Sequence, residues 1–195
     1  MGLWWAQGFL NYDGGNSENT NISLLIDPQY AKLGPYTKEP AIYRCPSDKS
    51  KVKTGRNQFL PRARSISMSA YVGGLGHCGL VPDPVKYGPQ KQSEIRAPSQ
   101  TFVFIDEHPD SIDFVTFLVE NRMDMGGLTF GSCPSSLHGG GATVSFADGH
   151  VELHRWQDPR TKPPVTYATR LEWDTTSTDN PDQQWLRDRT QLEHP

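Results

Sequence analysis

Residues 137–156 are LHGGGATVSFADGHVELHRW. Asp148-Gly149 lies between two segments in which apolar and polar residues alternate, a pattern typical of a β-hairpin with a two-residue turn. Folding the chain at this pair sets Phe146 opposite Val151 and brings the apolar residues of both segments onto one face, as a half-buried hairpin requires. The sequence therefore predicts a tight hairpin whose core face carries Val144, Phe146, Val151 and Leu153.

The rest of the chain predicts more strands than helices. Strands are expected at 41–44, 64–72, 101–106 and 114–120, and 101–106 is apolar on both faces, which indicates a central strand. Asp27-Pro28 and Asn180-Pro181 each place a capping side chain before a proline, so a short helix is expected after each. Without β-α-β alternation, these elements predict an α+β, β-rich fold: an antiparallel sheet with short peripheral helices and long loops.

Composition describes a folded chain with many loops. At 195 residues a single domain, 1–195, is the default, with the proline-rich tail 157–195 packing on it. Gly 18 and Pro 16 indicate long loops, while five Trp, seven Tyr and eight Phe supply bulk for a core. The net charge of −3 is spread along the chain, so no basic stripe points to nucleic acid.

Neither a membrane span nor a disulfide framework is indicated. The longest apolar windows, 3–10 and 101–105, fall well short of the ~20 residues that a span needs. No secretory signal peptide is recognisable, so we expect the chain as given to stay in solution without lipid or detergent. Cys45, Cys78 and Cys133 allow one disulfide in three ways, or three buried thiols, and their spacing is not that of a structural zinc site.

Several motifs occur in a recognisable order. His138 and Asp148-Gly149 are separated by nine residues, and the other motifs are NTN at 19–21, DP at 27–28, LGPY at 33–36, IYRCPSD at 42–48, RSISM at 64–68, FIDE at 104–107 and DPRT at 158–161. In these segments the chain resembles the prepilin-type processing-associated His-x9-Asp-Gly proteins, a family of pilin- and pseudopilin-like proteins. The resemblance covers nearly the whole chain.

The resemblance implies a structural or interaction module of the cell envelope or of type II secretion. Its partners would be other pilin-like subunits or secretion components, and its location the cell envelope or the secreted fraction. Such proteins carry an apolar anchor helix ahead of the globular part. This chain begins where the globular part begins, so we expect a pseudopilin-like globular domain without that helix.

An acidic cluster directly follows the predicted central strand. Asp106, Glu107 and Asp110 lie within five residues, and clustered carboxylates are good ligands for Ca²⁺. The resemblance to major pseudopilins also implies calcium in such a loop. Two close carboxylates would equally suit a glycoside hydrolase, and a solvated acidic turn is the plain alternative.

The position of this cluster relative to His138 depends on the strand order. If 101–106 runs antiparallel beside 142–147, Asp106 and Glu107 emerge next to His138 and could form a catalytic set with it. If 114–120 intervenes, or the strands run parallel, the cluster moves to the Asp148 end and a calcium loop is favoured. His138 and Asp148 themselves are expected about 20 Å apart, because an extended strand separates them.

Two weaker patterns complete the set of candidate sites. His150, Glu152 and His154 alternate along a predicted strand, so they share a face and could bind zinc, although an exposed sheet face is normally polar. Trp4-Trp5 could stack on a glycan or pack into the core. Two classes of function stay open: a pilin-like module, and a carbohydrate-active protein that binds glycans or hydrolyses glycosides with Asp106, Glu107 and His138.

Overall fold

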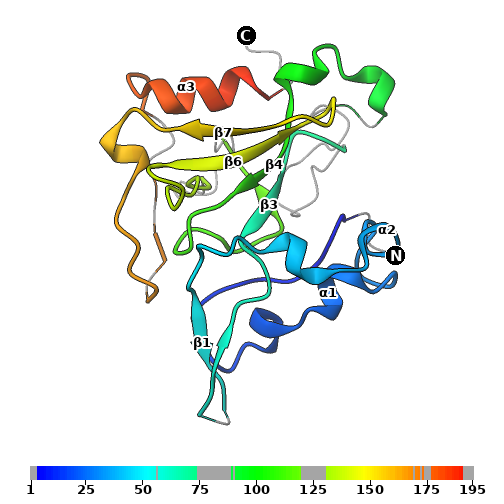
Figure 1. The fold of residues 1–195 in the computed structure, drawn as a ribbon, viewed down its shortest axis with the longest axis vertical. Helices are drawn as coiled ribbons and strands as arrows, with labels where there is room; N and C mark the ends of the chain where they lie inside the picture. The colour runs from blue at the N-terminus through cyan, green and yellow to red at the C-terminus, as the bar shows by residue number, and fades with distance from the viewer. Residues whose placement is uncertain are drawn as a thin grey trace, which may run out of the picture.

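The computed structural model describes residues 4–55, 57–73, 89, 91–119, 131–168, 170–171, 173 and 177–190. Cys78 lies outside these residues. The fold is α+β and dominated by strands, as predicted, with a five-stranded sheet, a separate two-stranded hairpin and short helices (Figure 1). In spatial order the large sheet consists of β5 (Thr116–Phe117), β3 (Ile66–Ser69), β4 (Phe102–Asp106), β6 (Gly141–Phe146) and β7 (Val151–Arg155).

β4 is the central strand, as its apolar sequence predicted. It pairs antiparallel with both β3 and β6, and an irregularity between Phe102 and Phe104 shifts the register against β6. Phe102 and Ile105 belong to one core and Phe104 packs against a second. The prediction of an antiparallel sheet needs one correction, because β5 pairs parallel with β3.

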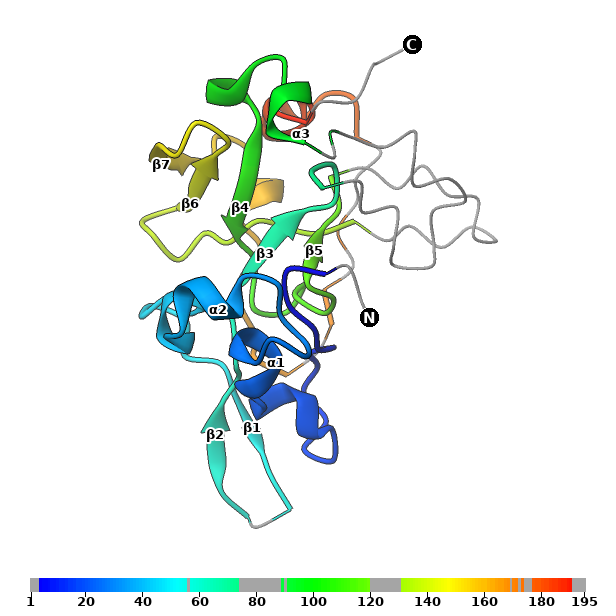
Figure 2. The ribbon, with the colours of Figure 1, turned by 90° about the vertical axis from the view of Figure 1, so that its right-hand side faces the viewer.

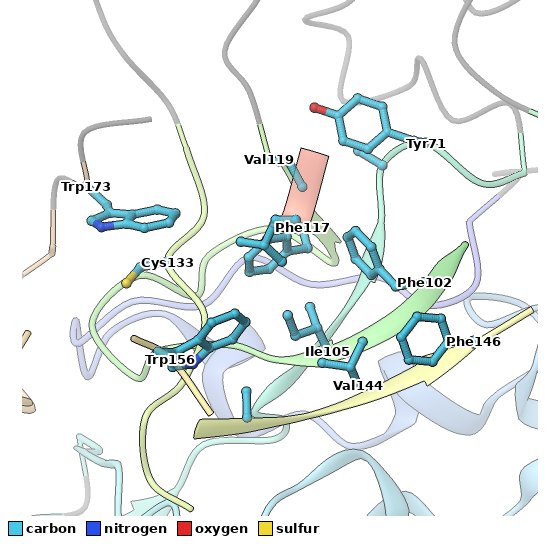
Figure 3. Close-up of a cluster of buried hydrophobic side chains, with 13 residues drawn as sticks. Tyr71, Phe102, Ile105, Phe117, Val119, Cys133, Val144, Phe146, Trp156 and Trp173 are labelled. Carbon is cyan, nitrogen blue, oxygen red and sulfur yellow. The ribbon is translucent and has the colours of Figure 1, made fainter. Parts of the chain in front are cut away.

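The first core lies between one face of the sheet and the C-terminal part of the chain. Figure 3 shows Phe102 and Ile105 of β4 beside Val144 of β6, with Trp156 next to Ile105 and Trp173 near Cys133 at the other side of the cluster. Helix α3 (Pro181–Asp188) adds Leu186, which is fully buried. The predicted cap is confirmed, since the Asn180 side chain accepts hydrogen bonds from the backbone N–H groups of residues 182 and 183.

The second core joins the N-terminal part of the chain to the other face of the sheet. Trp5 is buried and packs against Tyr43 and Phe104, with ring centroids 5.3 and 5.2 Å apart. Its indole N–H donates to the carbonyl of Val115 over 2.7 Å, so this part of the Trp4-Trp5 pair packs internally. Figure 2 shows the N-terminal elements below the large sheet: η1 (Ser17–Thr20), α1 (Ser23–Ile26), α2 (Gly34–Thr37), η2 (Pro40–Tyr43), β1 (Lys51–Lys53) and β2 (Phe59–Pro61).

The remaining elements are short 3-10 turns. Two elements predicted from the sequence, the helix after Asp27 and the strand at 41–44, do not form. The turns are η4 (Gln92–Glu94), η5 (Pro98–Gln100) and η6 (Pro159–Thr161). Asp27 ends α1 instead of starting a helix, because its carboxylate accepts from Gln29 N–H and closes a turn. The strand predicted at 41–44 is the 3-10 helix η2, in which Glu39 caps the Ala41 N–H. No helix among the described residues is long and apolar enough to cross a membrane.

The hairpin of β6 and β7 forms, but its register differs by one residue from the prediction. Phe146 N–H donates to the carbonyl of His150 over 2.9 Å, and Gly149 N–H donates back to the carbonyl of Phe146. The loop therefore has three residues, 147–149, and Gly149 adopts a φ of 93°, as in a turn that ends in a left-handed glycine. Ser145, not Phe146, lies opposite Val151.

A one-residue slip moves every side chain of a strand to the opposite face. Val144 and Phe146 face the core as predicted, but Val151 and Leu153 are 60% and 50% exposed. The prediction was wrong for β7 because it assumed a two-residue turn.

We predict that Phe146→Ala destabilises the protein far more than Leu153→Ala. Phe146 is 4% exposed, and truncating a buried Phe costs about 3–5 kcal/mol. Leu153 is half exposed, so its truncation should cost about 1 kcal/mol or less. Urea unfolding of both variants measures the difference, and equal losses would contradict the observed register.

Candidate functional site

The end of β4 brings Asp106 beside His138, as the antiparallel alternative predicted. Ile105 points into the first core, so Asp106 projects from the opposite face of the strand. Its Oδ2 accepts a hydrogen bond from Thr143 N–H of β6 over 3.1 Å and lies 3.3 Å from His138 Nε2. Burial raises the pKa of Asp106, and the hydrogen bonds from Thr143 and His138 oppose that rise.

His138 is positioned by the glycine run that precedes and starts β6. Gly139 and Gly140 have φ values of 64° and 85°, a conformation that glycine adopts without strain. A Cβ atom on Gly141 would lie 2.1 Å from the carbonyl oxygen of His154 on β7. Only glycine permits this approach, and the turn that carries His138 is thereby held at the end of the hairpin.

Cys45 completes the cluster from the N-terminal part of the chain. Its Sγ lies 3.1 Å from His138 Nε2 and accepts a hydrogen bond from Ser47 N–H over 3.3 Å. The backbone N–H of Cys45 donates to Ser65 Oγ over 2.7 Å, which ties this segment to the start of β3. Cys45 is a free thiol.

One donor atom each from Cys45, Asp106 and His138 lies within 4.8 Å of the others, and among the described residues this is the only such group of three. Cys45 and Asp106 are buried, whereas the His138 side chain is 28% exposed. We call these three residues the Cys-Asp-His cluster. It is closed on the protein side and open to solvent at the imidazole.

The geometry of the cluster is not that of a nucleophile relay. In a relay one imidazole nitrogen takes the nucleophile's proton and the other is held by the carboxylate. Here the same nitrogen, Nε2 of His138, lies near both Cys45 Sγ and Asp106 Oδ2. The three donors converge on one point instead of forming a chain.

Glu107 belongs to different surroundings from Asp106. Its Oε1 accepts a hydrogen bond from Ser111 Oγ over 3.2 Å inside the protein, and adjacent residues of a strand project to opposite faces. Burial and the nearby charge of Asp113 raise the pKa of Glu107 from 4.5 to about 8, against the opposing effects of the positive charge on Arg64 and of neighbouring serine hydroxyls. Of the three residues expected to form a catalytic set, the structure brings Asp106 and His138 together and places Glu107 in a different environment.

Asp110 forms a third, separate set of contacts. Its carboxylate accepts hydrogen bonds from Tyr12 Oη at 2.8 Å, from Thr166 N–H and Oγ1 at 2.6 and 2.9 Å, and from Tyr167 N–H at 3.0 Å. These donors occupy the oxygens that a calcium ion would need. The predicted calcium set of Asp106, Glu107 and Asp110 does not converge, because its members face different partners.

A pocket of about 310 Å³ lies beside Asp110. Tyr12 and Arg62 line it, and the Arg62 guanidinium stacks over the Tyr12 ring at 4.4 Å. Burial, with the hydrogen bond to Asp110, raises the pKa of Tyr12 despite the nearby positive charge of Arg62. The phenol therefore acts as a fixed donor to Asp110.

His150, Glu152 and His154 share one face, as predicted, but the corrected register turns that face toward α3. His150 stacks on Phe146 with centroids 4.3 Å apart, and its Nδ1 lies 2.6 Å from Asp148 Oδ1. His154 stacks on Trp185 of α3 at 3.8 Å, and burial lowers its pKa. The predicted zinc set is not among the convergent groups of the described residues.

Sequence reasoning missed Cys45 as a partner of His138. The two residues are 93 positions apart, and the Cys-Pro-Ser-Asp segment was recognised only as a motif. No spacing rule could have joined them, because the contact depends on how the N-terminal part packs against the sheet. No protein-family model, curated protein or solved structure matches the chain.

Glu107 should make stability depend on pH. The pKa of Glu107 is 4.5 in the unfolded chain and about 8 in the folded protein. At pH values between these two, the folded protein holds a proton that the unfolded chain has lost. The free energy of unfolding therefore falls as pH rises through this window. Glu107→Gln keeps the side chain neutral at every pH. At a pH below the unfolded-state pKa the variant should therefore have the wild-type Tm. At a pH above the folded-state pKa its Tm should exceed that of wild type by at least ~2 °C.

Thermal unfolding across this pH range measures the effect, and Glu152→Gln is the matched control. The Glu152 side chain is 41% exposed, so this variant should keep the wild-type pH profile. Parallel profiles for wild type and Glu107→Gln would show that Glu107 ionises normally.

Proposed function

We propose that this protein is a pilin-like module of the cell envelope or secretion machinery that acts by binding other subunits and not by catalysis. The motifs at 19–21, 42–48, 64–68, 104–107 and 158–161 occur in the order typical of that family. The proposal rests mainly on the location of the polar residues in these motifs. Most of them are buried and form the internal framework: Asn19, Cys45, Asp48, Arg64, Ser65, Ser67, Asp106, Glu107 and Thr161.

These buried residues connect the parts of the chain. Arg64 donates to Ser67 Oγ over 3.0 Å and to the carbonyl of Asp113 over 2.9 Å, which links β3 to the loop after β4. The backbone carbonyl of Asn19 accepts a hydrogen bond from Ala63 N–H over 2.7 Å. Buried polar groups that bond one another specify a packing arrangement, which is a structural role.

The carbohydrate-active alternative has less support. A glycoside hydrolase needs two carboxyl groups that face one substrate across a gap of roughly 5–9.5 Å. Asp106 contacts His138 and Glu107 contacts Ser111, so the two carboxyl groups do not face a common space. Trp5, which could have stacked on a sugar, packs against Tyr43 and Phe104.

In the sheet that the described residues form, β7 is an edge strand and offers a surface for a second copy of the chain. Val151 and Leu153 project from it into solvent, and an edge strand with exposed apolar side chains readily pairs with another strand. Two copies paired antiparallel about Leu153 would set Glu152 of one copy opposite His154 of the other. We therefore assign subunit contact to β7.

Self-association tests this assignment. We expect concentration-dependent dimers in sedimentation velocity, and Leu153→Lys should weaken them at least ~10-fold, about 1.4 kcal/mol. Ile22→Lys is the matched control, because Ile22 is 49% exposed and Leu153 is 50% exposed. A monomer at every concentration, or equal weakening by both variants, would exclude β7 as the contact.

A screen of chromogenic glycosides tests the absence of catalysis. We expect no turnover above a buffer blank. Turnover that Glu107→Gln abolishes, in a variant that stays folded, would replace the proposed function with hydrolysis.

A further inference from the structure

We propose that Cys45, Asp106 and His138 form a binding site for one divalent transition-metal ion, with zinc as the best fit. A thiolate, an imidazole and a carboxylate are the ligand types that zinc takes in proteins. Calcium and magnesium take oxygen ligands and do not use a thiolate. The choice of metal therefore follows from Cys45, and it differs from the calcium expected for the acidic cluster alone.

The spacing of the donor atoms fits such an ion. Cys45 Sγ and Asp106 Oδ2 lie 3.1 and 3.3 Å from His138 Nε2. Zinc bonds of about 2.0–2.3 Å in a tetrahedron separate neighbouring donors by roughly 3.3–3.6 Å. Both distances to His138 Nε2 therefore lie within a few tenths of an ångström of the zinc values, and Cys45 Sγ and Asp106 Oδ2 lie within 4.8 Å of each other.

Three protein ligands leave one position of a tetrahedron open. The His138 side chain is 28% exposed, whereas Cys45 and Asp106 are buried, so solvent reaches the cluster from the side of the imidazole. Sites with three protein ligands and an open position are typical of exchangeable or catalytic zinc. The Cys-Asp-His cluster has this form.

Outer hydrogen bonds hold two of the three ligands. Thr143 N–H donates to Asp106 Oδ2 over 3.1 Å, and Ser47 N–H donates to Cys45 Sγ over 3.3 Å. Such partners orient metal ligands and stabilise the anionic thiolate. Binding displaces the thiol proton of Cys45, which passes to solvent as the sulfur–metal bond forms.

The three ligands come from segments that are far apart in the sequence. Asp106 ends β4, His138 precedes β6, and Cys45 follows η2 in the N-terminal part. An ion bound by all three would link the sheet to the N-terminal part, and a ligand that binds only the folded state raises its stability. Metal binding should therefore raise Tm. This inference needs only the folded chain and is independent of the pilin-like proposal.

Titration of the reduced, metal-free protein with Co²⁺ tests the site directly. We expect one equivalent to bind with a thiolate-to-cobalt charge-transfer band, Zn²⁺ to displace it, and Zn²⁺ but neither Ca²⁺ nor Mg²⁺ to raise Tm. Cys45→Ser should abolish the band. His138→Gln and Asp106→Asn should each weaken Zn²⁺ binding at least ~10–100-fold, the loss known for outer partners alone.

Matched controls separate this site from other thiols and imidazoles. His150→Gln removes a histidine that also contacts a carboxylate, Asp148, and should leave the affinity unchanged. Cys78→Ser and Cys133→Ser should keep the band. If the thiolate-to-cobalt band is absent in wild type, or if it is still present in Cys45→Ser, the proposal is wrong. Because His138 is partly exposed, His138→Gln tests the site even if Asp106→Asn fails to fold, and unchanged affinity in that variant would likewise exclude it.

Discussion

The antiparallel pairing of β4 with β6 is the constraint on which the rest of the structure depends. β4 is covered on both faces, by Phe102 and Ile105 in one core and by Phe104 in the other, so it can only be a central strand. Because β4 and β6 are antiparallel, the end of β4 lies next to the turn that precedes β6. Asp106 therefore meets His138. Trp5 packs against both Phe104 of β4 and Tyr43, and this packing brings in the segment that carries Cys45.

The end of β4 gives two neighbouring carboxylates different chemistry. Asp106 lies beside a partly exposed imidazole and a thiol, which suits a metal ion. Glu107 points into the protein, where burial raises its pKa to about 8 and keeps it largely protonated at neutral pH. The alternation of a strand, which sends successive side chains to opposite faces, accounts for this separation.

Much of the architecture could be predicted because it depends on local patterns. The apolar run at 101–106 predicted the central strand, and Asn180-Pro181 predicted the start of α3. Of the candidate site, the pairing of Asp106 with His138 could be derived once adjacent antiparallel strands were assumed. The hairpin was placed correctly but its register was not, because Asp-Gly fits both a two-residue turn and the end of a three-residue turn.

The sequence by itself determined the fold class, the central strand, the capped C-terminal helix and the position of the hairpin. These features depend on side-chain periodicity, turn residues and caps within a few positions of one another. Only the tertiary structure decided which face of β7 is exposed, that Glu107 lies apart from Asp106, and that Cys45 meets His138 across 93 positions. Such contacts depend on the packing of distant segments, for which local spacing carries no information.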